Sequence, residues 1–259
     1  MTRPAMLVTG GAARIGGAIA QRFAAEGWHV VIHYGFSGED AEQLAASLPS
    51  AETVQCDLAD GDCAVQMIEE LAARLGDWRV LVNNASIFRP DDVTALDPAL
   101  NAEAMQVNAA TPARMSQTFL AHARSDTGRR VIQITDQKLA NPNPDFFSYT
   151  MSKHALAATV PMLAHLRKEG GAAASDDRVY GLAPGAILPS HDQSEEEAEI
   201  SHRLNLLKRR TGVDEIADAA LFLAQGWLAS GETLLVDSGQ HLVRQPRDVI
   251  YLARTVSHS

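Results

Sequence analysis

The sequence predicts an α/β domain in which a mainly parallel sheet of seven strands carries helices on both faces. Three observations support this fold. The length of 259 residues suits one large domain. Strand-like and helix-like segments alternate from the first residues, and the strand-like segments are apolar throughout, as in sheets that are covered on both faces. Right-handed crossovers then give a doubly wound sheet. We expect one domain over residues 1–259, with 243–259 as a C-terminal extension.

Four strands and three helices are predicted in the first third of the chain. In the first helix, Ile15, Ile19 and Phe23 share one face, and Gly27 ends the helix. The predicted strands are Ala5–Thr9, His29–Tyr34, Thr53–Gln55 and Val80–Val82, and the predicted helices are Ile15–Glu26, Asp40–Leu48 and Asp62–Leu75.

The remaining elements follow the same alternation. The predicted helices are Ala102–Ala123, Ser148–Lys168 and Asp214–Ala224, and the predicted strands are Arg130–Thr135, Arg178–Leu182 and Thr233–Val236. The first two of these helices are rich in alanine, which suits close helix packing. The acidic run Asp192–Glu199 lies between elements and is expected to be a mobile loop or a short helix.

Composition excludes several classes of function. Hydrophobic residues make up 46% and charged residues 21%, which is typical of a globular protein. We expect no signal peptide and no membrane span, because no apolar run has the required length. Cys56 and Cys63 lack metal-ligand spacing, so free thiols in a reducing, cytoplasmic compartment are expected. The net charge of −10 argues against nucleic acid as a partner.

A glycine-rich segment, Thr9–Gly17, joins the first strand to the first helix. Glycines at this point permit a tight turn, and they allow backbone N–H groups to approach a pyrophosphate at the helix N-terminus. We therefore predict a nucleotide site that includes Gly10, Ile15 and Gly16. The alternative is an ordinary strand-to-helix loop.

The end of the second strand favours NADPH over NADH. An NAD site usually places a carboxylate there, but the nearest acids, Glu39 and Asp40, come several residues later. Arg14, in the glycine segment, can instead bind a 2′-phosphate through its guanidinium. The alternative is a solvated surface arginine.

Polar residues also follow the third and fourth strands. Asp57, before Leu58, can accept a hydrogen bond from an adenine amino group, or it can cap the following turn. Asn83 and Asn84 can bridge neighbouring strand ends and line the cleft, or they can be plain turn residues.

Tyr149 and Lys153 are four residues apart and therefore share a helix face. A nearby ammonium favours the phenolate, so we expect Lys153 to lower the pKa of Tyr149 toward working pH. Lys153 can also hold ribose hydroxyls of a cofactor. The alternative is an ordinary surface pair.

Asp136 and Asn108 complete a candidate catalytic set. Asp136 ends the fifth strand, at the sheet edge where open α/β folds bind ligands. Asn108 is a poor interior helix residue. It can bend its helix and hold a water that relays protons to Lys153. The alternatives are a turn-forming aspartate and a satisfied buried amide.

Taken together, these residues resemble the short-chain dehydrogenases/reductases over most of the chain. The resemblance rests on the glycine segment, Asn83-Asn84-Ala85, Asn108, Tyr149-x-x-x-Lys153, Ala183-Pro184-Gly185 and Val236-Asp237-Ser238-Gly239. It implies an NADP(H)-dependent oxidoreductase with a Rossmann-type fold, and it adds Leu58, Ala85, Pro184 and Gly185 to the expected cofactor contacts. Relatives form tetramers, so a homotetramer is expected.

Within that family, the chain is similar to the pteridine reductase and dihydromonapterin reductase branch. Most of the family has a glycine where this chain has Arg14 and a serine where it has Asp136, whereas the branch has a basic residue and an aspartate at these two positions. The branch also ends its second strand in a His-Tyr pair, here His33-Tyr34, and Ser37 matches a serine that contacts the cofactor phosphate. One departure is Phe36, which stands where the branch often has an arginine.

The resemblance also implies a substrate pocket and a reaction. Ser86 would contact a pterin, and Phe88 would stack the pterin against the nicotinamide. The expected reaction is hydride transfer to the C6=N5 bond of a 7,8-dihydropterin such as dihydromonapterin or dihydrobiopterin, or of dihydrofolate. Tyr149 would donate a proton, Lys153 and Asn108 would supply the relay, and Asp136 would serve N5 as a proton shuttle.

Two other functions remain open from the sequence. One is a reductase of 3-oxoacyl thioesters, sugars or other ketones, against which Asp136 in the usual serine position argues. The other is a non-catalytic NADP-binding sensor, against which the joint presence of Asn108, Tyr149 and Lys153 argues. The resemblance is silent about the extension. We hypothesise that it folds over the substrate cleft, where Arg244 or Arg247 would meet a folate glutamate; the alternative is a surface extension at a subunit contact.

Overall fold

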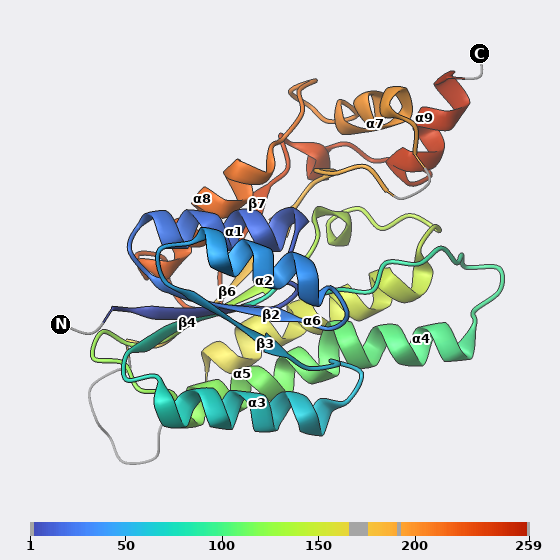
Figure 1. The fold of residues 1–259 in the computed structure, drawn as a ribbon. Helices are drawn as coiled ribbons and strands as arrows, with labels where there is room; N and C mark the ends of the chain where they lie inside the picture. Colours follow the sequence, from blue (N-terminus) through green and yellow to red (C-terminus); the bar gives the residue numbers. More distant parts are fainter. Residues whose placement is uncertain (1–2, 166–175, 191–192, 258–259) are drawn as a thin grey trace.

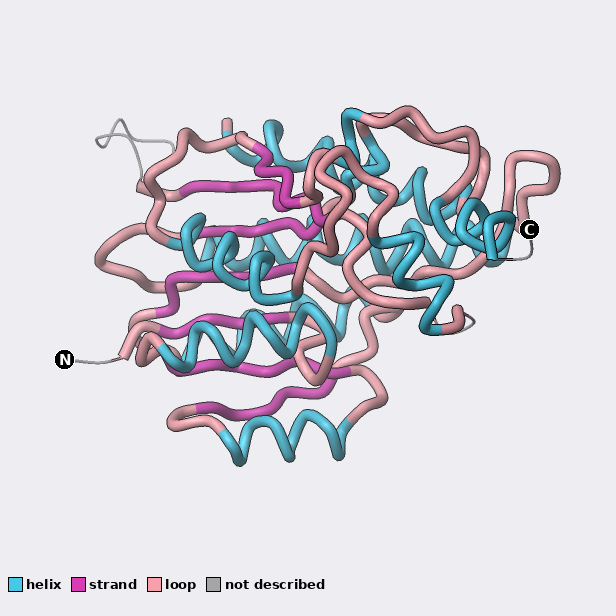
Figure 2. The backbone as a smooth tube through the Cα atoms, turned by 90° about the horizontal axis from the view of Figure 1, so that it is seen from above, coloured by secondary structure: helices cyan, strands magenta, loops and turns pink. Residues whose placement is uncertain are grey.

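The computed structural model describes residues 3–165, 176–190 and 193–257. Seven strands form one sheet in which every neighbouring pair is parallel, in the order β3-β2-β1-β4-β5-β6-β7. Figure 2 shows the strands side by side, with helices that lie over the sheet and run roughly along the strands. The predicted doubly wound fold is confirmed. The strands are β1 (Ala5–Val8), β2 (His29–Tyr34), β3 (Ala51–Gln55), β4 (Trp78–Asn83), β5 (Arg130–Ile134), β6 (Arg178–Pro184) and β7 (Thr233–Val236).

Helices cover both faces of the sheet, because successive strand residues point to opposite sides. Met6 and Val8 of β1 belong to a core cluster with helices α1, α2 and α8, whereas Ala5 and Leu7 belong to a second cluster on the side of α3, α5 and α6. Figure 1 shows these two layers on either side of the strands. The helices are α1 (Arg14–Ala25), α2 (Gly38–Ser47), α3 (Gly61–Arg74), α4 (Pro98–Met105), α5 (Thr111–His122), α6 (Phe147–Ala164), α7 (Glu195–His202), α8 (Val213–Ala224) and α9 (Val249–Ser257).

The long helix predicted over Ala102–Ala123 is interrupted. A π-helical segment, Gln106–Ala110, separates α4 from α5 and contains Asn108. In a regular α-helix the carbonyl of Asn108 would accept from the N–H four residues later, but that residue is Pro112, which has no N–H. The missing donor gives a physical reason for the wider turn at this point.

Two other predicted segments differ in extent. The helix predicted over Ser148–Lys168 is α6, which begins at Phe147 and is described as far as Ala164; residues 166–168 lie outside the described residues. The short helix α7 begins within the acidic run and continues past it to His202, and its N-terminus has a capping box between Ser194 and Glu197. Asp192 of that run also lies outside the described residues.

The C-terminal extension is described as far as Ser257. After β7, a 3₁₀ turn (Gln240–Leu242) leads to α9, which packs against α7. Figure 1 shows α7 and α9 together, beyond the main helical layers. Among the described residues, no helix combines the length and the apolar character that a membrane crossing requires, and no cluster of His, Cys, Asp and Glu suited to a metal ion is found there.

The centre of the second core cluster gives a stability prediction. The Trp78 side chain is fully buried, packs edge-to-face on Phe119 at 4.7 Å and donates from its indole nitrogen to the Val80 carbonyl at 2.9 Å. Trp78→Ala is expected to lower the free energy of unfolding by about 3–5 kcal/mol in denaturant titration. Trp227→Ala, at a site that is 72% exposed, is the matched control and should cost about 1 kcal/mol or less. Equal losses would contradict this assignment of the core.

Candidate active site

A cavity of about 600 Å³ opens at the carboxyl ends of the strands. Its walls come from the loops that follow β1, β2, β4, β5 and β6, from the first turn of α6 and from the C-terminal extension. This is the edge at which open α/β sheets bind ligands. Most of the predicted site residues line it: Gly10, Arg14, Ile15, Gly16, Tyr34, Ser37, Asn84, Ala85, Ser86, Phe88, Asp136, Tyr149, Lys153, Pro184 and Gly185.

The glycine segment forms a tight cradle at one end of the cavity. Gly10 has a φ of +59°, and a Cβ at Gly16 would come within 2.2 Å of the Gly10 carbonyl oxygen. The Asn84 side chain donates to the carbonyls of Thr9 and Gly10 at 2.9 and 3.2 Å, so it bridges β4 and β1 as expected. The cradle therefore fits a diphosphate that approaches the backbone closely.

His33 supports this cradle from below rather than lining the cavity. The His33 side chain is 1% exposed; its Nδ1 accepts from the Gly10 N–H at 3.2 Å, which leaves Nε2 to donate to the Cys56 carbonyl at 2.9 Å. Burial lowers the pKa of His33 to about 4. Its neutral form thus fixes the position of the glycine segment relative to the end of β3.

Two further predicted cofactor residues, Asp57 and Leu58, also lie outside the lining of the cavity. The Asp57 carboxylate accepts from the Ala59 N–H at 3.0 Å, which is the turn-capping arrangement, and Leu58 is buried. Asn83 likewise points away from the cavity: it is buried, and its amide donates to Gln133 and Ser116.

Arg14 occupies an unusual backbone position. Its φ is +55°, in the left-handed region that favours glycine, and its guanidinium donates to the Pro189 carbonyl at 3.3–3.4 Å. Tyr34 and Ser37, at the end of β2, line the same cavity. Phe36 is 89% exposed and is absent from that lining.

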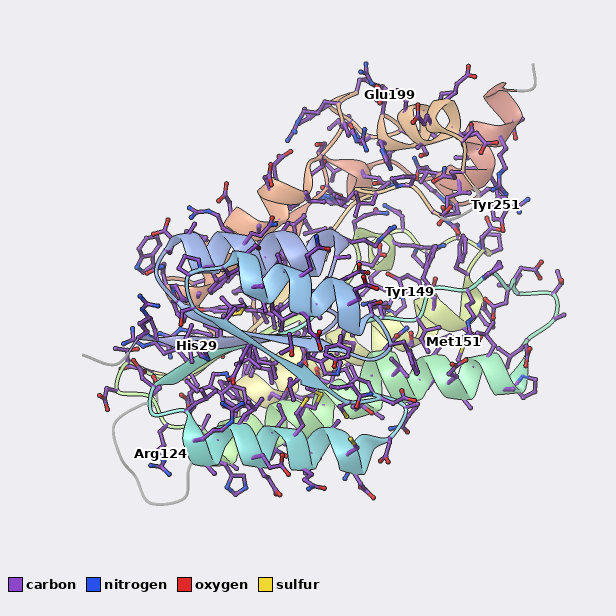
Figure 3. All side chains as sticks on the ribbon, viewed as in Figure 1. His29, Arg124, Tyr149, Met151, Glu199 and Tyr251 are labelled. Atoms are coloured by element: carbon purple, nitrogen blue, oxygen red, sulfur yellow. The ribbon has the colours of Figure 1, made fainter. Side chains whose placement is uncertain are left out.

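The candidate proton donor is a hydrogen-bonded pair. The Tyr149 hydroxyl donates to Asp136 Oδ2 at 2.7 Å, and Asp136 Oδ1 accepts from the Lys138 N–H, also at 2.7 Å. Figure 3 shows Tyr149 between the sheet and the C-terminal part of the chain, which carries Tyr251. Asp136 thus meets the reactive phenol, and its carboxyl lines the cavity at the same point.

The pair favours the protonated phenol. Burial, and then the charge and hydrogen bond of Asp136, raise the pKa of Tyr149 well above its ordinary value. The expected lowering by Lys153 is therefore wrong for this arrangement. Lys153 Nζ donates to the Ile134 carbonyl at 2.7 Å, and burial lowers its own pKa to about 8. Burial also raises the pKa of Asp136, so this carboxyl is a better proton carrier than a free aspartate.

Asn108 is a fully buried link between two walls of the site. Its side chain accepts from the Ile87 N–H at 2.7 Å and donates to the Ile87 carbonyl and to Ser152 Oγ, both at 2.9 Å. It thereby connects the loop after β4 to α6. These contacts match the alternative of a satisfied amide, and a relay to Lys153 stays a prediction.

Aromatic rings pack beside Tyr149. Phe88 is 40% exposed, stacks on Phe146 with centroids 4.1 Å apart and meets Tyr149 edge-to-face at 4.7 Å. Lys138, Asp248, Val249 and Ile250 also line the cavity, although the sequence prediction did not include them. Lys138 could have been predicted from the sequence, because it lies two residues after Asp136. The tail residues Asp248, Val249 and Ile250 could not, because they are far from any motif in the sequence.

Comparisons with known proteins agree with this geometry. The family model described as enoyl-(acyl carrier protein) reductase matches residues 10–241. A crystal structure from Brucella canis, of FolM alternative dihydrofolate reductase 1 complexed with NADP, superposes with a TM-score of 0.85 at 34% identity, covering 95% of this chain and 96% of that one. A putative ketoacyl reductase 2 of the granaticin polyketide synthase from Streptomyces violaceoruber is 33% identical, covering 93% and 97%. Pteridine reductase 1 from Leishmania tarentolae is 29% identical, covering 94% and 98%.

The buried imidazole of His33 predicts a pH dependence of stability. Its folded pKa of about 4 lies below the ordinary value of 6.5, so the unfolded chain binds more protons between these values. His33 therefore stabilises the fold above pH 6.5 by about 3 kcal/mol, and this contribution is lost as the pH falls toward 4.

The measurement is urea unfolding at several pH values between 7 and 4. His33→Gln, which cannot titrate, should be less stable at pH 7 but should lose less stability on acidification. Parallel curves for the two proteins would contradict the prediction.

Proposed function

The chain belongs to the short-chain dehydrogenase/reductase family of oxidoreductases, and on that premise we propose that it reduces a pteridine with NADPH. The observation that carries this proposal is the 2.7 Å hydrogen bond between Tyr149 and Asp136. A carboxyl beside the phenol can pass a proton to a ring nitrogen, which a hydroxyl in its place would do poorly. The FolM and pteridine reductase relatives support the same substrate class.

NADPH is the cofactor that these residues would hold. The glycine cradle at Gly10 and Gly16 would receive the diphosphate, and the Arg14 guanidinium and the Ser37 hydroxyl, which both line the cavity, would supply donors for a 2′-phosphate. The NADP-bound structures among the relatives support this assignment. When bound, NADPH supplies a hydride for the C6=N5 bond of a 7,8-dihydropterin.

The chain's own residues then handle the proton and the position of the ring. The hydroxyl of Tyr149 and the carboxyl of Asp136 together hold a proton at the floor of the cavity, from which N5 of the substrate takes it. Lys153, which packs under the phenol ring at 5.6 Å, stabilises the charge left after proton transfer. Phe88 offers an exposed face for stacking, worth about 0.5–1.5 kcal/mol beyond its burial.

A ketone reductase is the second candidate, because a ketoacyl reductase is among the relatives with 33% identity. The two candidates differ in the role of Asp136. In ketone reduction Tyr149 must give its proton to the carbonyl oxygen of the substrate, and Asp136, which accepts the Tyr149 hydrogen bond, would hinder that transfer. A non-catalytic sensor has weaker support, since Asn108, Tyr149 and Lys153 are all present and Tyr149 and Lys153 line the cavity.

We also propose that residues 1–259 act as one domain and that four copies assemble in the cytoplasm. The support is the resemblance to tetrameric relatives and the surface of α6, where Ala155, Ala157 and Ala158 are not buried and Met162 is 71% exposed. Sedimentation would report the number of copies directly.

The pterin assignment predicts a different outcome for each candidate function. The purified enzyme should oxidise NADPH, measured by absorbance, with dihydrobiopterin, dihydromonapterin or dihydrofolate, and faster than with acetoacetyl thioester. Tyr149→Phe and Asp136→Ser should each lower kcat/KM for the pterin by roughly 100-fold or more, because each removes a proton carrier. The exposed Glu69→Gln serves as control. Turnover of the thioester but of no pterin would overturn the substrate assignment.

Cofactor choice gives a separate prediction for Arg14. Arg14→Gly suits the left-handed backbone at this position and removes the guanidinium. KM for NADPH should rise roughly 10-fold, as expected for the loss of a charge-assisted hydrogen bond, while KM for NADH should change little. Arg14→Lys should retain part of the NADPH preference. An unchanged preference in both variants would remove Arg14 from the phosphate site.

A further inference from the structure

Four charged side chains join the C-terminal extension to the loop that follows β5. We call this group the tail clasp; it consists of Lys138, Asp145, Arg247 and Asp248. Lys138 Nζ donates to the Asp145 carbonyl at 2.7 Å and to Asp248 Oδ2 at 3.0 Å. The Asp145 carboxylate accepts from Arg247 Nε at 2.8–2.9 Å and from the Asp248 N–H at 2.7 Å.

The tail clasp differs from a surface ion pair because its inner part is buried. The side chains of Lys138, Asp145 and Asp248 are 5%, 4% and 12% exposed, whereas that of Arg247 is 52% exposed. A buried ammonium that loses its carboxylate partner keeps an uncompensated charge in a poorly solvated place. The inner pair, Lys138 with Asp248, should therefore have a larger electrostatic effect on neighbouring groups than the outer pair, Arg247 with Asp145.

The tail clasp also fixes a wall of the active site. The residues directly after Asp248, Val249 and Ile250, line the cavity, and Ile250 packs in a buried cluster with Phe146 and Tyr149. Tyr251 stacks near Phe146 at 6.0 Å, and Phe146 itself adopts a left-handed φ of +54° while buried. The hypothesis that the extension folds over the cleft thus has a geometric basis within one subunit. Arg247 is already paired with Asp145.

The inner pair lies next to the candidate proton donor. The backbone N–H of Lys138 binds Asp136 Oδ1, and the Lys138 side chain carries its ammonium to Asp248. The charged and titratable groups that face the Asp136–Tyr149 pair are Lys153 from α6, Lys138 from the turn after β5 and Asp248 from the tail. Two of the three are cations, and Asp248 is the anion that pairs with one of them, Lys138.

We propose that Asp248 is a positioning residue of this reductase, which acts through Lys138. By neutralising the Lys138 ammonium, it keeps the Asp136–Tyr149 pair in the protonated form that can give a proton to the substrate. The inference rests on the proposed role of this pair as proton source, but it applies to a pterin or to a ketone equally. The directions of the pKa shifts agree: Lys138 lowers the pKa of Asp136, and Asp248 raises that of Tyr149.

The test is the pH profile of kcat/KM, measured with whichever substrate the wild-type enzyme reduces. Activity should fall as the pH rises through the apparent pKa of the coupled pair. In Asp248→Asn, this alkaline limb should move to lower pH by roughly 1 unit, because the free ammonium favours the deprotonated pair. Lys138→Gln should move the limb the opposite way. The double variant, Lys138→Gln with Asp248→Asn, should return close to the wild-type profile.

Two control variants separate electrostatics from packing. Arg247→Gln breaks the outer pair, so it loosens the tail but leaves the Lys138–Asp248 charge balance intact. It should lower the Tm without moving the limb. Glu69→Gln makes the same charge change as Asp248→Asn at an exposed position on α3, and it should leave both the limb and the Tm unchanged.

A second measurement does not need turnover. The infrared carbonyl stretch of protonated Asp136, identified by its loss in Asp136→Asn, can be titrated in wild type and in Asp248→Asn. A lower midpoint in Asp248→Asn supports the proposal even if no pterin is reduced. Two outcomes would show that Asp248 has a structural role alone. One is that Asp248→Asn lowers the Tm but moves neither the alkaline limb nor the infrared midpoint. The other is that the double variant shifts the alkaline limb further than Asp248→Asn does.

Discussion

A single hydrogen bond, from the Tyr149 hydroxyl to the Asp136 carboxylate, ties together the two halves of the site. It joins the end of β5 to the first turns of α6. Burial raises the pKa of both groups, while the hydrogen bond itself favours a neutral phenol and an ionised carboxyl. The shared proton is what distinguishes this site from one with a serine at position 136. This hydrogen bond is the observation on which the proposed reduction of a nitrogen heterocycle rests.

The parallel sheet makes the arrangement possible. All seven strands run in one direction, so every loop that carries a site residue emerges at the same edge. Buried polar contacts then fix the loops in position. His33 holds the glycine segment, Asn84 bridges β1 to β4, and Asn108 ties the loop after β4 to α6. These side chains contribute to function by restraining the backbone, and His33 and Asn108 do so without lining the cavity themselves.

The extension closes the substrate side of the cavity. Its residues come last in the chain, yet Ile250 packs against Tyr149 and Phe146, and Val249 lines the cavity, because the tail clasp anchors this segment to the loop after β5. The same anchor brings a carboxylate, Asp248, to the ammonium of Lys138, near the Asp136–Tyr149 pair. One short segment, Asp248–Ile250, thus supplies both part of the cavity wall and the carboxylate that pairs with Lys138.

The sequence by itself determined the order of the seven strands along the chain, the glycine cradle and the Tyr149–Lys153 face, because periodicity and i, i+4 spacing are local properties. It also placed Asp136 at a strand end. The tertiary structure decided the rest: that His33 and Asp57 support loops instead of lining the cavity, and that Arg14 takes a left-handed backbone. It also decided that the pKa of Tyr149 is raised and that Asp248 reaches Lys138 across 110 residues. Burial and long-range pairing depend on packing in three dimensions, which no local pattern encodes.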